Sequence, residues 1–192
     1  MILPIVAYGD PVLRKEGVDI DKDYPKLGDL IDNMFDTMYN ANGVGLAAHQ
    51  IGKAIRLFVV DASPFAEEGE PDYEMLKDYK KVFINARITD VAGDDWGFNE
   101  GCLTIPDIHE DVLRPETIFI EYYDENWEFH KEEISGLASR VIQHEYDHIE
   151  GILFTDKLSG LKKRLLKGKL ANISKGKIDP GYNMKYPLKK GR

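Results

Sequence analysis

The chain has 192 residues, of which 43% are hydrophobic and 31% charged, and its formal net charge is −9 at pH 7. This length and composition suit one domain with a packed core, and they exclude a disordered polymer or a coiled coil. No apolar run approaches the roughly 18 to 20 residues that cross a bilayer, and the short apolar N-terminus lacks a basic lead-in. We therefore expect neither a signal peptide nor a membrane partner.

The charge is unevenly distributed along the chain. Residues 157–192 hold 12 Lys and Arg against the single acid Asp179, whereas residues 1–156 hold 13 Lys and Arg against 33 acids. A basic end on an acidic body indicates contact with an anionic partner, and a solvated terminal helix is the alternative. We expect one domain over residues 1–160, followed by a basic C-terminal helix and tail over residues 161–192.

The first predicted element is an amphipathic helix over residues 25–40. Asp23 is its expected N-cap and Gly43 its expected stop. The apolar side chains of this segment recur at the i, i+3, i+4 and i+7 spacing of one helix face. They are Leu27, Leu30, Ile31, Met34, Phe35 and Met38.

Four β-rich runs follow. Residues 55–61 (IRLFVVD) predict a buried strand. Residues 62–80 are polar and acidic, which indicates an exposed loop before a second strand over residues 81–90. Residues 117–123 and 127–134 flank an Asp-Glu-Asn turn signal, so they predict a β-hairpin.

Two helices complete the predicted elements. One covers residues 135–150, and Gly151 stands where its C-terminal cap belongs. The other leads into the basic end of the chain, and its apolar side chains are Leu158, Leu161, Leu165 and Leu166. Strands followed by a central helix, with one helix before and one after, predict an α+β fold.

The strongest local motif is His144-Glu145-Tyr146-Asp147-His148, an H-E-x-x-H sequence. Two histidines four residues apart on a helix lie one turn above each other, so their imidazoles converge on one point and can bind one metal ion. Glu145 lies at the edge of the same face, within reach of a water on that ion. The alternative is a polar helix face with two hydrogen-bonded histidines, but Leu137 and Val141 in the turn above are apolar.

A catalytic metal site needs three protein ligands and one open position. No histidine follows His148 and no glutamate follows Glu150, which disfavours the usual metalloprotease arrangement. The third ligand is therefore expected upstream, where the candidates are Cys102, His49, His109, His130 or a carboxylate. We favour Cys102, because a thiolate is a good ligand for zinc or ferrous iron. As the single cysteine it excludes an intramolecular disulfide and suits the cytosol, and a buried unreactive thiol is the alternative.

A third motif is GVGLAAHQ at residues 43–50. Glycines at alternate positions, followed by two alanines, allow the backbone to approach another group closely. Gln50 ends the motif with an amide that can donate a hydrogen bond. Alone, such a motif is typical of an ordinary glycine-rich turn.

Together, GVGLAAHQ (43–50), EGCLT (100–104) and QHEYDH (143–148) closely resemble the three signature motifs of the peptide deformylase family, in the family's order and approximate spacing. YGDP at residues 8–11 and GILF at residues 151–154 extend the resemblance across most of residues 1–160. The resemblance implies a cytoplasmic hydrolase that removes the formyl group from the N-terminal methionine of newly made polypeptides and releases formate. It also implies antiparallel sheets packed around a central helix that carries the two histidines.

The resemblance assigns roles by motif match. The metal ligands would be Cys102, His144 and His148. Glu145 would be the general base and then the acid, and Gln50 and the backbone N–H of Leu103 would hold the oxyanion. The substrate-binding residues would include Gly45, which hydrogen-bonds the substrate backbone, and Arg114, which supports this region.

Helix phase and proximity predict that Val44, Leu137 and Val141 line the pocket for the methionine side chain. Arg140 is expected to point to the rim of this pocket, and His49 to lie at the surface or beside the metal ligands. One thiolate and two imidazoles accept Fe²⁺, Zn²⁺, Ni²⁺ or Co²⁺. The resemblance suggests ferrous iron in the cell.

Two rival functions stay open: a cysteine hydrolase that uses Cys102 with a histidine, and a non-catalytic binding module stabilised by a closed metal site. The basic end suggests ribosome docking, since relatives in the family bind there through a basic C-terminal helix. The side chains available for it are Lys162, Lys163, Arg164, Lys167 and Lys169. We expect nascent formylmethionyl polypeptides as partners and no DNA.

Overall fold

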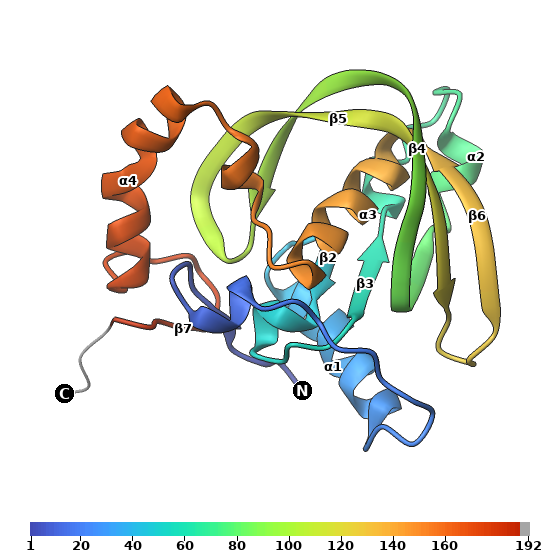
Figure 1. Cartoon of the computed structure of the whole chain (residues 1–192), viewed down its shortest axis with the longest axis horizontal. Helices are drawn as coiled ribbons and strands as arrows, with labels where there is room; N and C mark the ends of the chain where they lie inside the picture. Colours follow the sequence, from blue (N-terminus) through green and yellow to red (C-terminus); the bar gives the residue numbers. More distant parts are fainter. Residues whose placement is uncertain (189–192) are drawn as a thin grey trace.

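The computed structural model describes residues 1–188 and has an α+β architecture (Figure 1). A five-stranded antiparallel sheet has the order β2-β3-β4-β5-β6, and a two-stranded parallel sheet joins β1 to β7. The strands are β1 (Ile5–Val6), β2 (Gly45–Ala47), β3 (Leu57–Asp61), β4 (Lys80–Cys102), β5 (Ile105–Tyr123), β6 (Phe129–Ser135) and β7 (Met184–Lys185). The α-helices of the described residues are α1 (Leu27–Asn40), α2 (Tyr73–Leu76), α3 (Gly136–Ile149) and α4 (Gly160–Ser174). None of these helices combines the length and hydropathy needed to span a membrane.

Strands β4 and β5 form a long ribbon that curves over α3 in Figure 1. Register shifts interrupt their pairing at four places, and such bulges bend a strand pair. The sequence predicted only residues 81–90 and 117–123 of this ribbon. Residues 91–99 of the missed part are exposed or half-buried, and over residues 105–116 buried and exposed side chains alternate among charged residues and prolines. Neither stretch has the continuous hydrophobic run that identifies a buried strand. The hairpin between β5 and β6 is confirmed.

Helix α3 confirms the helix predicted over residues 135–150. It buries Val141 and Ile142, and it contacts β2, β3, β5 and β6. Gly151 ends it with a φ of +72°, and its N–H donates to the carbonyl of His148. A Cβ at Gly151 would also lie 2.9 Å from the backbone of Arg14, so only glycine fits there.

Helix α1 buries the six apolar side chains that the sequence placed on one face. Its predicted caps are wrong. The N-cap is Lys26, which directly follows Pro25 and has a left-handed conformation with no side-chain hydrogen bond. At the other end the left-handed residue is Asn42, one position before Gly43.

The segment over residues 62–80 is not wholly an exposed loop, as the sequence predicted. It contains α2, and the side chains of Leu76 and Tyr79 are buried in the core next to Phe58 and Phe83. The segment is polar overall, so its composition does not predict that these two side chains are buried. Their burial depends on core residues that are distant in sequence.

Helix α4 buries Leu166, Leu170 and Ile173 against the N-terminal segment, whereas Leu161 and Leu165 are 62% and 72% exposed. The predicted helix is present, but these two of the four leucines named for it lie outside the core. The chain then turns back, and β7 pairs with β1 beside the N-terminal segment (Figure 1). Lys189, Lys190 and Arg192 of the predicted tail lie outside the described residues.

Candidate metal centre and active site

The ends of two elements bring a thiol and two imidazoles together. Cys102 ends β4, and His144 and His148 lie one turn apart on α3. One ligand atom from each of these residues lies within 4.8 Å of the other two, and Cys102 Sγ is 3.3 Å from His148 Nε2. The sequence therefore identified three side chains that the fold places in one cluster.

This cluster fits a divalent metal ion. Its donors are one soft sulfur and two borderline nitrogens, the ligand set that suits zinc or ferrous iron. Burial lowers the pKa of His148 well below its usual value, which favours the neutral imidazole that binds a metal. Burial also opposes the charged form of His144, but hydrogen bonds to Cys102 and Glu100 outweigh it and raise the pKa of that ring, so metal binding there releases a proton. No fourth Cys, His, Asp or Glu joins the cluster among residues 1–188, which leaves a coordination position for water or substrate.

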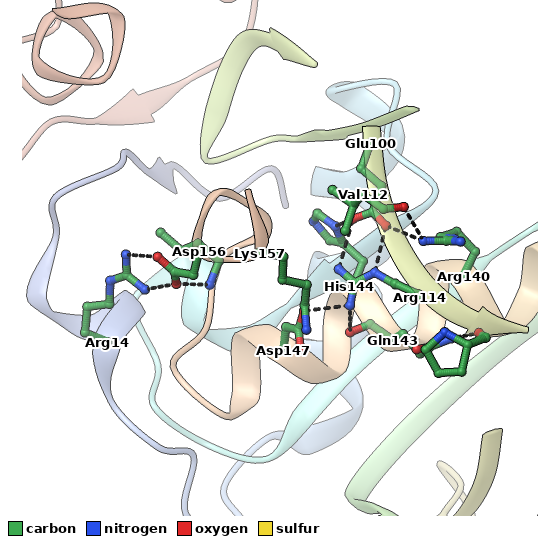
Figure 2. A network of polar contacts seen from close by, with 12 residues as sticks. Arg14, Glu100, Val112, Arg114, Arg140, Gln143, His144, Asp147, Asp156 and Lys157 are labelled. Carbon is green, nitrogen blue, oxygen red and sulfur yellow. Dashed lines mark hydrogen bonds and ion pairs between the residues drawn. The ribbon is translucent and has the colours of Figure 1, made fainter. Parts of the chain in front are cut away.

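Glu100 orients one of the two histidines (Figure 2). Its buried carboxylate accepts a hydrogen bond from Nδ1 of His144 at 3.0 Å, and this contact directs Nε2 of the same ring toward the cluster. Desolvation alone would raise the pKa of Glu100, but its hydrogen bonds to His144 and Arg114 hold that pKa well below the usual range. No role for Glu100 was predicted from the sequence, although it is the first residue of the EGCLT motif.

Two arginines complete the network around Glu100. Arg114 donates to both carboxylate oxygens, at 2.7 and 2.9 Å, and its other nitrogen donates to Asp147 at 2.7 Å. Figure 2 shows Arg114 between these two acids. Arg140 donates to Glu100 at 3.1 Å and stacks on the ring of Trp96. Arg140 is only 2% exposed, so the prediction that it points to the rim is wrong.

Glu145 lies beside the cluster and is almost completely buried, with Oε2 lacking a hydrogen-bond partner among the described residues. Burial raises the pKa of its carboxyl to about 7, although His144 and Arg114 oppose the shift. Gly45 packs directly on this carboxylate, since a Cβ at that position would lie 2.4 Å from Oε1. Gly45 of the GVGLAAHQ motif is therefore required because any larger side chain would collide with Glu145.

Gln50 is fixed in one orientation. Its Oε1 accepts a hydrogen bond from the Ala47 N–H at 2.7 Å. Its Nε2 consequently faces the end of β4, where it lies 3.3 Å from Thr104 Oγ1 and 3.6 Å from Cys102 Sγ. The amide is thus a fixed donor beside the metal cluster.

A cleft of about 520 Å³ opens over these groups. Of the residues predicted to bind substrate, Val44, Gly45 and Val141 line it, whereas Leu137 and Arg114 do not. Other lining residues were not predicted, and they include Phe65, Phe98, His109, Pro180 and Tyr182. Phe98 and His109 lie within five residues of the EGCLT motif, whereas Phe65, Pro180 and Tyr182 come from segments that are remote from the three motifs.

The structure excludes a surface position for His49. Its side chain is fully buried, and Nε2 lies 3.0 Å from the carbonyl oxygen of Lys15. Burial also lowers the pKa of His49. Neither His49 nor the candidates His109 and His130 belong to the metal cluster.

An α+β fold with a three-ligand metal cluster beside a buried glutamate defines the class of metal-dependent hydrolases. The model of the polypeptide deformylase family matches residues 2–164. The peptide deformylases of Christiangramia forsetii and Flavobacterium johnsoniae are 64% and 56% identical to this chain, each over 100% of both chains. The chain belongs to the polypeptide deformylase family.

Solved structures agree with this assignment. A plant peptide deformylase, PDF1B, superimposes with a TM-score of 0.79 at 35% identity, over 91% of this chain and 90% of that one. The peptide deformylase of Legionella pneumophila gives 0.77 at 34% identity, over 92% and 98%. The protein is thus an enzyme that removes the formyl group from the N-terminus of nascent polypeptides, as the sequence predicted.

Proposed function

We propose that deformylation takes place in the cleft over Cys102, His144 and His148, which hold one divalent metal ion, with Glu145 as the group that transfers the proton. The observation that carries this assignment is the approach of the three ligand atoms to within 4.8 Å of one another beside the buried Glu145. The finer architecture proposed here has α3 as the central helix that presents both histidines.

When bound, the ion would supply two effects: it would lower the pKa of a water to about 7, and it would polarise the carbonyl oxygen of the formyl group. Glu145 accepts a proton from the water as the water oxygen attacks the formyl carbon. It returns this proton to the nitrogen as the C–N bond breaks, which yields formate and a free amine. A carboxyl whose pKa is about 7 is suited to both steps at neutral pH.

Gln50 and the backbone N–H of Leu103 stabilise the negative charge that develops on the formyl oxygen. The Ala47 contact supports this role, because it holds the Gln50 amide in place before substrate binds. Preorganised donors of this kind avoid reorganisation during the reaction, and loss of one typically costs about 2.7–4 kcal/mol of transition-state stabilisation.

The substrate backbone is proposed to pair with Gly45. Strand β2 lies at the edge of the five-stranded sheet, and Gly45 lines the cleft. An extended peptide can add to such an edge through main-chain hydrogen bonds. Val44 and Val141 then surround the methionine side chain, and Arg114 supports the site through Glu100.

We propose ferrous iron as the metal in the cell, with Zn²⁺, Ni²⁺ and Co²⁺ as ions that the same ligands accept. Anaerobic metal analysis, combined with formate release from a formylmethionyl peptide, tests this assignment. Chelation should abolish formate release, and Fe²⁺ should restore it. Activity that survives complete removal of metal would instead support a cysteine hydrolase, and a fourth protein ligand would support a non-catalytic module.

We propose that the cytoplasmic enzyme meets its substrate at the ribosome through α4. Its outer face carries Arg164, Lys167 and Lys169, and the exposed Leu165 lies among them. A double substitution of Lys167 and Lys169 by Glu should weaken cosedimentation with ribosomes, with Lys53→Glu as a matched surface control. Truncation near residue 160, the proposed end of the catalytic domain, would be a poor test because it also removes β7.

A further inference from the structure

We propose that Tyr182, which follows α4 and precedes β7, is a positioning residue for deformylation. Its hydroxyl holds the turn between β4 and β5, and this turn carries both Cys102 and Leu103. The inference rests on the proposed function, because it concerns how the metal ligand and the oxyanion donor are kept in place.

The turn between β4 and β5 is very short. Cys102 pairs with Ile105, so only Leu103 and Thr104 form the loop. The carbonyl oxygens of these two residues each accept a hydrogen bond from a different part of the chain. Tyr182 Oη donates to the Leu103 oxygen at 2.7 Å, and the Tyr8 N–H donates to the Thr104 oxygen at 3.0 Å.

The position of Tyr182 is itself fixed by backbone hydrogen bonds on its C-terminal side. The Ile5 N–H donates to the Asn183 oxygen and the Ala7 N–H to the Lys185 oxygen, both at 2.9 Å. These bonds belong to the β1–β7 pairing, which Figure 1 shows beside the N-terminal segment. The C-terminal segment therefore reaches the cleft as part of a sheet, and its attachment does not depend on Tyr182 alone.

Tyr182 also forms part of the cleft wall. Its half-buried ring lines the cleft together with Pro180, and it packs against the core cluster that also contacts the Leu103 side chain. Burial raises the pKa of its hydroxyl, so the group stays protonated and remains a donor at working pH.

The bond to the Leu103 oxygen has a direct consequence for the reaction. The Leu103 carbonyl lies in the peptide plane shared with Thr104, and the Leu103 N–H lies in the adjoining plane shared with Cys102. Because the pairing of Cys102 with Ile105 closes the turn at both ends, anchoring the first plane limits the coupled backbone rotation that would turn the second plane, and its N–H, away from the cleft. Without the hydroxyl, the N–H would sample orientations that do not meet the formyl oxygen. Because this contact matters most when negative charge develops, its loss should lower kcat more than it raises KM.

Tyr182→Phe removes the hydroxyl and keeps the ring, and Tyr73→Phe on α2 is the matched control. With the zinc-loaded enzyme and a formylmethionyl peptide, we expect Tyr182→Phe to lower kcat about three- to tenfold, the effect of one hydrogen bond, with KM within twofold. Amide hydrogen exchange at Leu103 and Thr104 should accelerate in this variant, whereas Tyr73→Phe should match the parent in all three measurements. If Tyr182 only stabilised the fold, Tyr182→Phe would lower the melting temperature and leave kcat of the folded fraction unchanged.

Wild-type kcat and unchanged amide exchange in Tyr182→Phe would overturn the inference. Glu145→Gln, measured in the same assay, separates this result from failure of the proposed function. If the parent is active and Glu145→Gln is inactive while Tyr182→Phe is normal, only the role of Tyr182 is refuted. If Glu145→Gln retains full activity, the proposed function itself is refuted.

Discussion

Glu100 Oε2 lies 3.0 Å from Nδ1 of His144, and the same carboxylate receives both Arg114 and Arg140. A buried acid thus links β4, β5 and α3 directly behind the metal cluster. The contact fixes which nitrogen of His144 faces the cluster with Cys102 and His148, and the arginines keep the acid charged.

Substitution of Glu100 by Gln should weaken metal binding and destabilise the fold. Loss of such a contact to a ligand typically lowers metal affinity 10- to 100-fold. Arg140 would also lose its carboxylate partner and Arg114 one of its two, and breaking a buried ion pair costs roughly 3–5 kcal/mol. Competition with a chelator and chemical denaturation measure these effects, with Glu110→Gln on β5 as the control. Metal affinity equal to that of the parent would contradict the role of Glu100.

Substitution of Glu145 by Gln should abolish proton transfer and leave the metal in place. General acid–base groups contribute about 10²- to 10⁴-fold to rate, so kcat for formate release should decrease by at least a factor of about 10². Metal content after purification should equal that of the parent, because Glu145 is not part of the ligand cluster. A fall of less than tenfold would favour a cysteine hydrolase.

Gly45→Ala should reduce activity strongly, because the added methyl group would lie 2.4 Å from Oε1 of Glu145. The carboxylate or β2 must move, and the proposed pairing with substrate is lost. Gly168→Ala on α4 is a suitable control: a Cβ there meets nothing within 4 Å among the described residues, so this change should stabilise the helix by up to about 1 kcal/mol. Steady-state kinetics and thermal unfolding distinguish the two variants, and normal kinetics for Gly45→Ala would refute the argument from close approach.

The pair of Arg14 and Asp156 should make stability depend on acid pH. Desolvation opposes ionisation of Asp156, but its hydrogen bonds to Arg14 and to the Leu153 N–H outweigh it and lower the pKa of the carboxyl. This contribution is present above the unfolded pKa of about 3.9 and is lost as pH falls through the lower folded value. Asp156→Asn should therefore melt below the parent at pH 7, and the difference should shrink in acid. The exposed control Asp94→Asn should show no such pH-dependent difference, and an equal difference at pH 7 and pH 3 would exclude this linkage.

The sequence alone determined the parts of the site that depend on local geometry. The helical repeat places His144 and His148 on one face regardless of the rest of the fold, and the chemistry of sulfur makes Cys102 the natural third ligand. The family was also evident from three motifs in order. The α+β class followed from the order of hydrophobic runs, which depends on short-range periodicity.

Only the tertiary structure decided which distant groups meet. Glu100 carries no sequence signal that it will lie between two arginines and His144, and Tyr182 is separated from Leu103 by 79 positions in the chain. The ribbon of β4 and β5 was predicted only in part, because residues 91–102 are mostly exposed and their pairing depends on backbone hydrogen bonds, which leave no hydrophobic pattern. Long-range hydrogen bonds and burial arise only when the chain has folded, so they cannot be predicted from local composition.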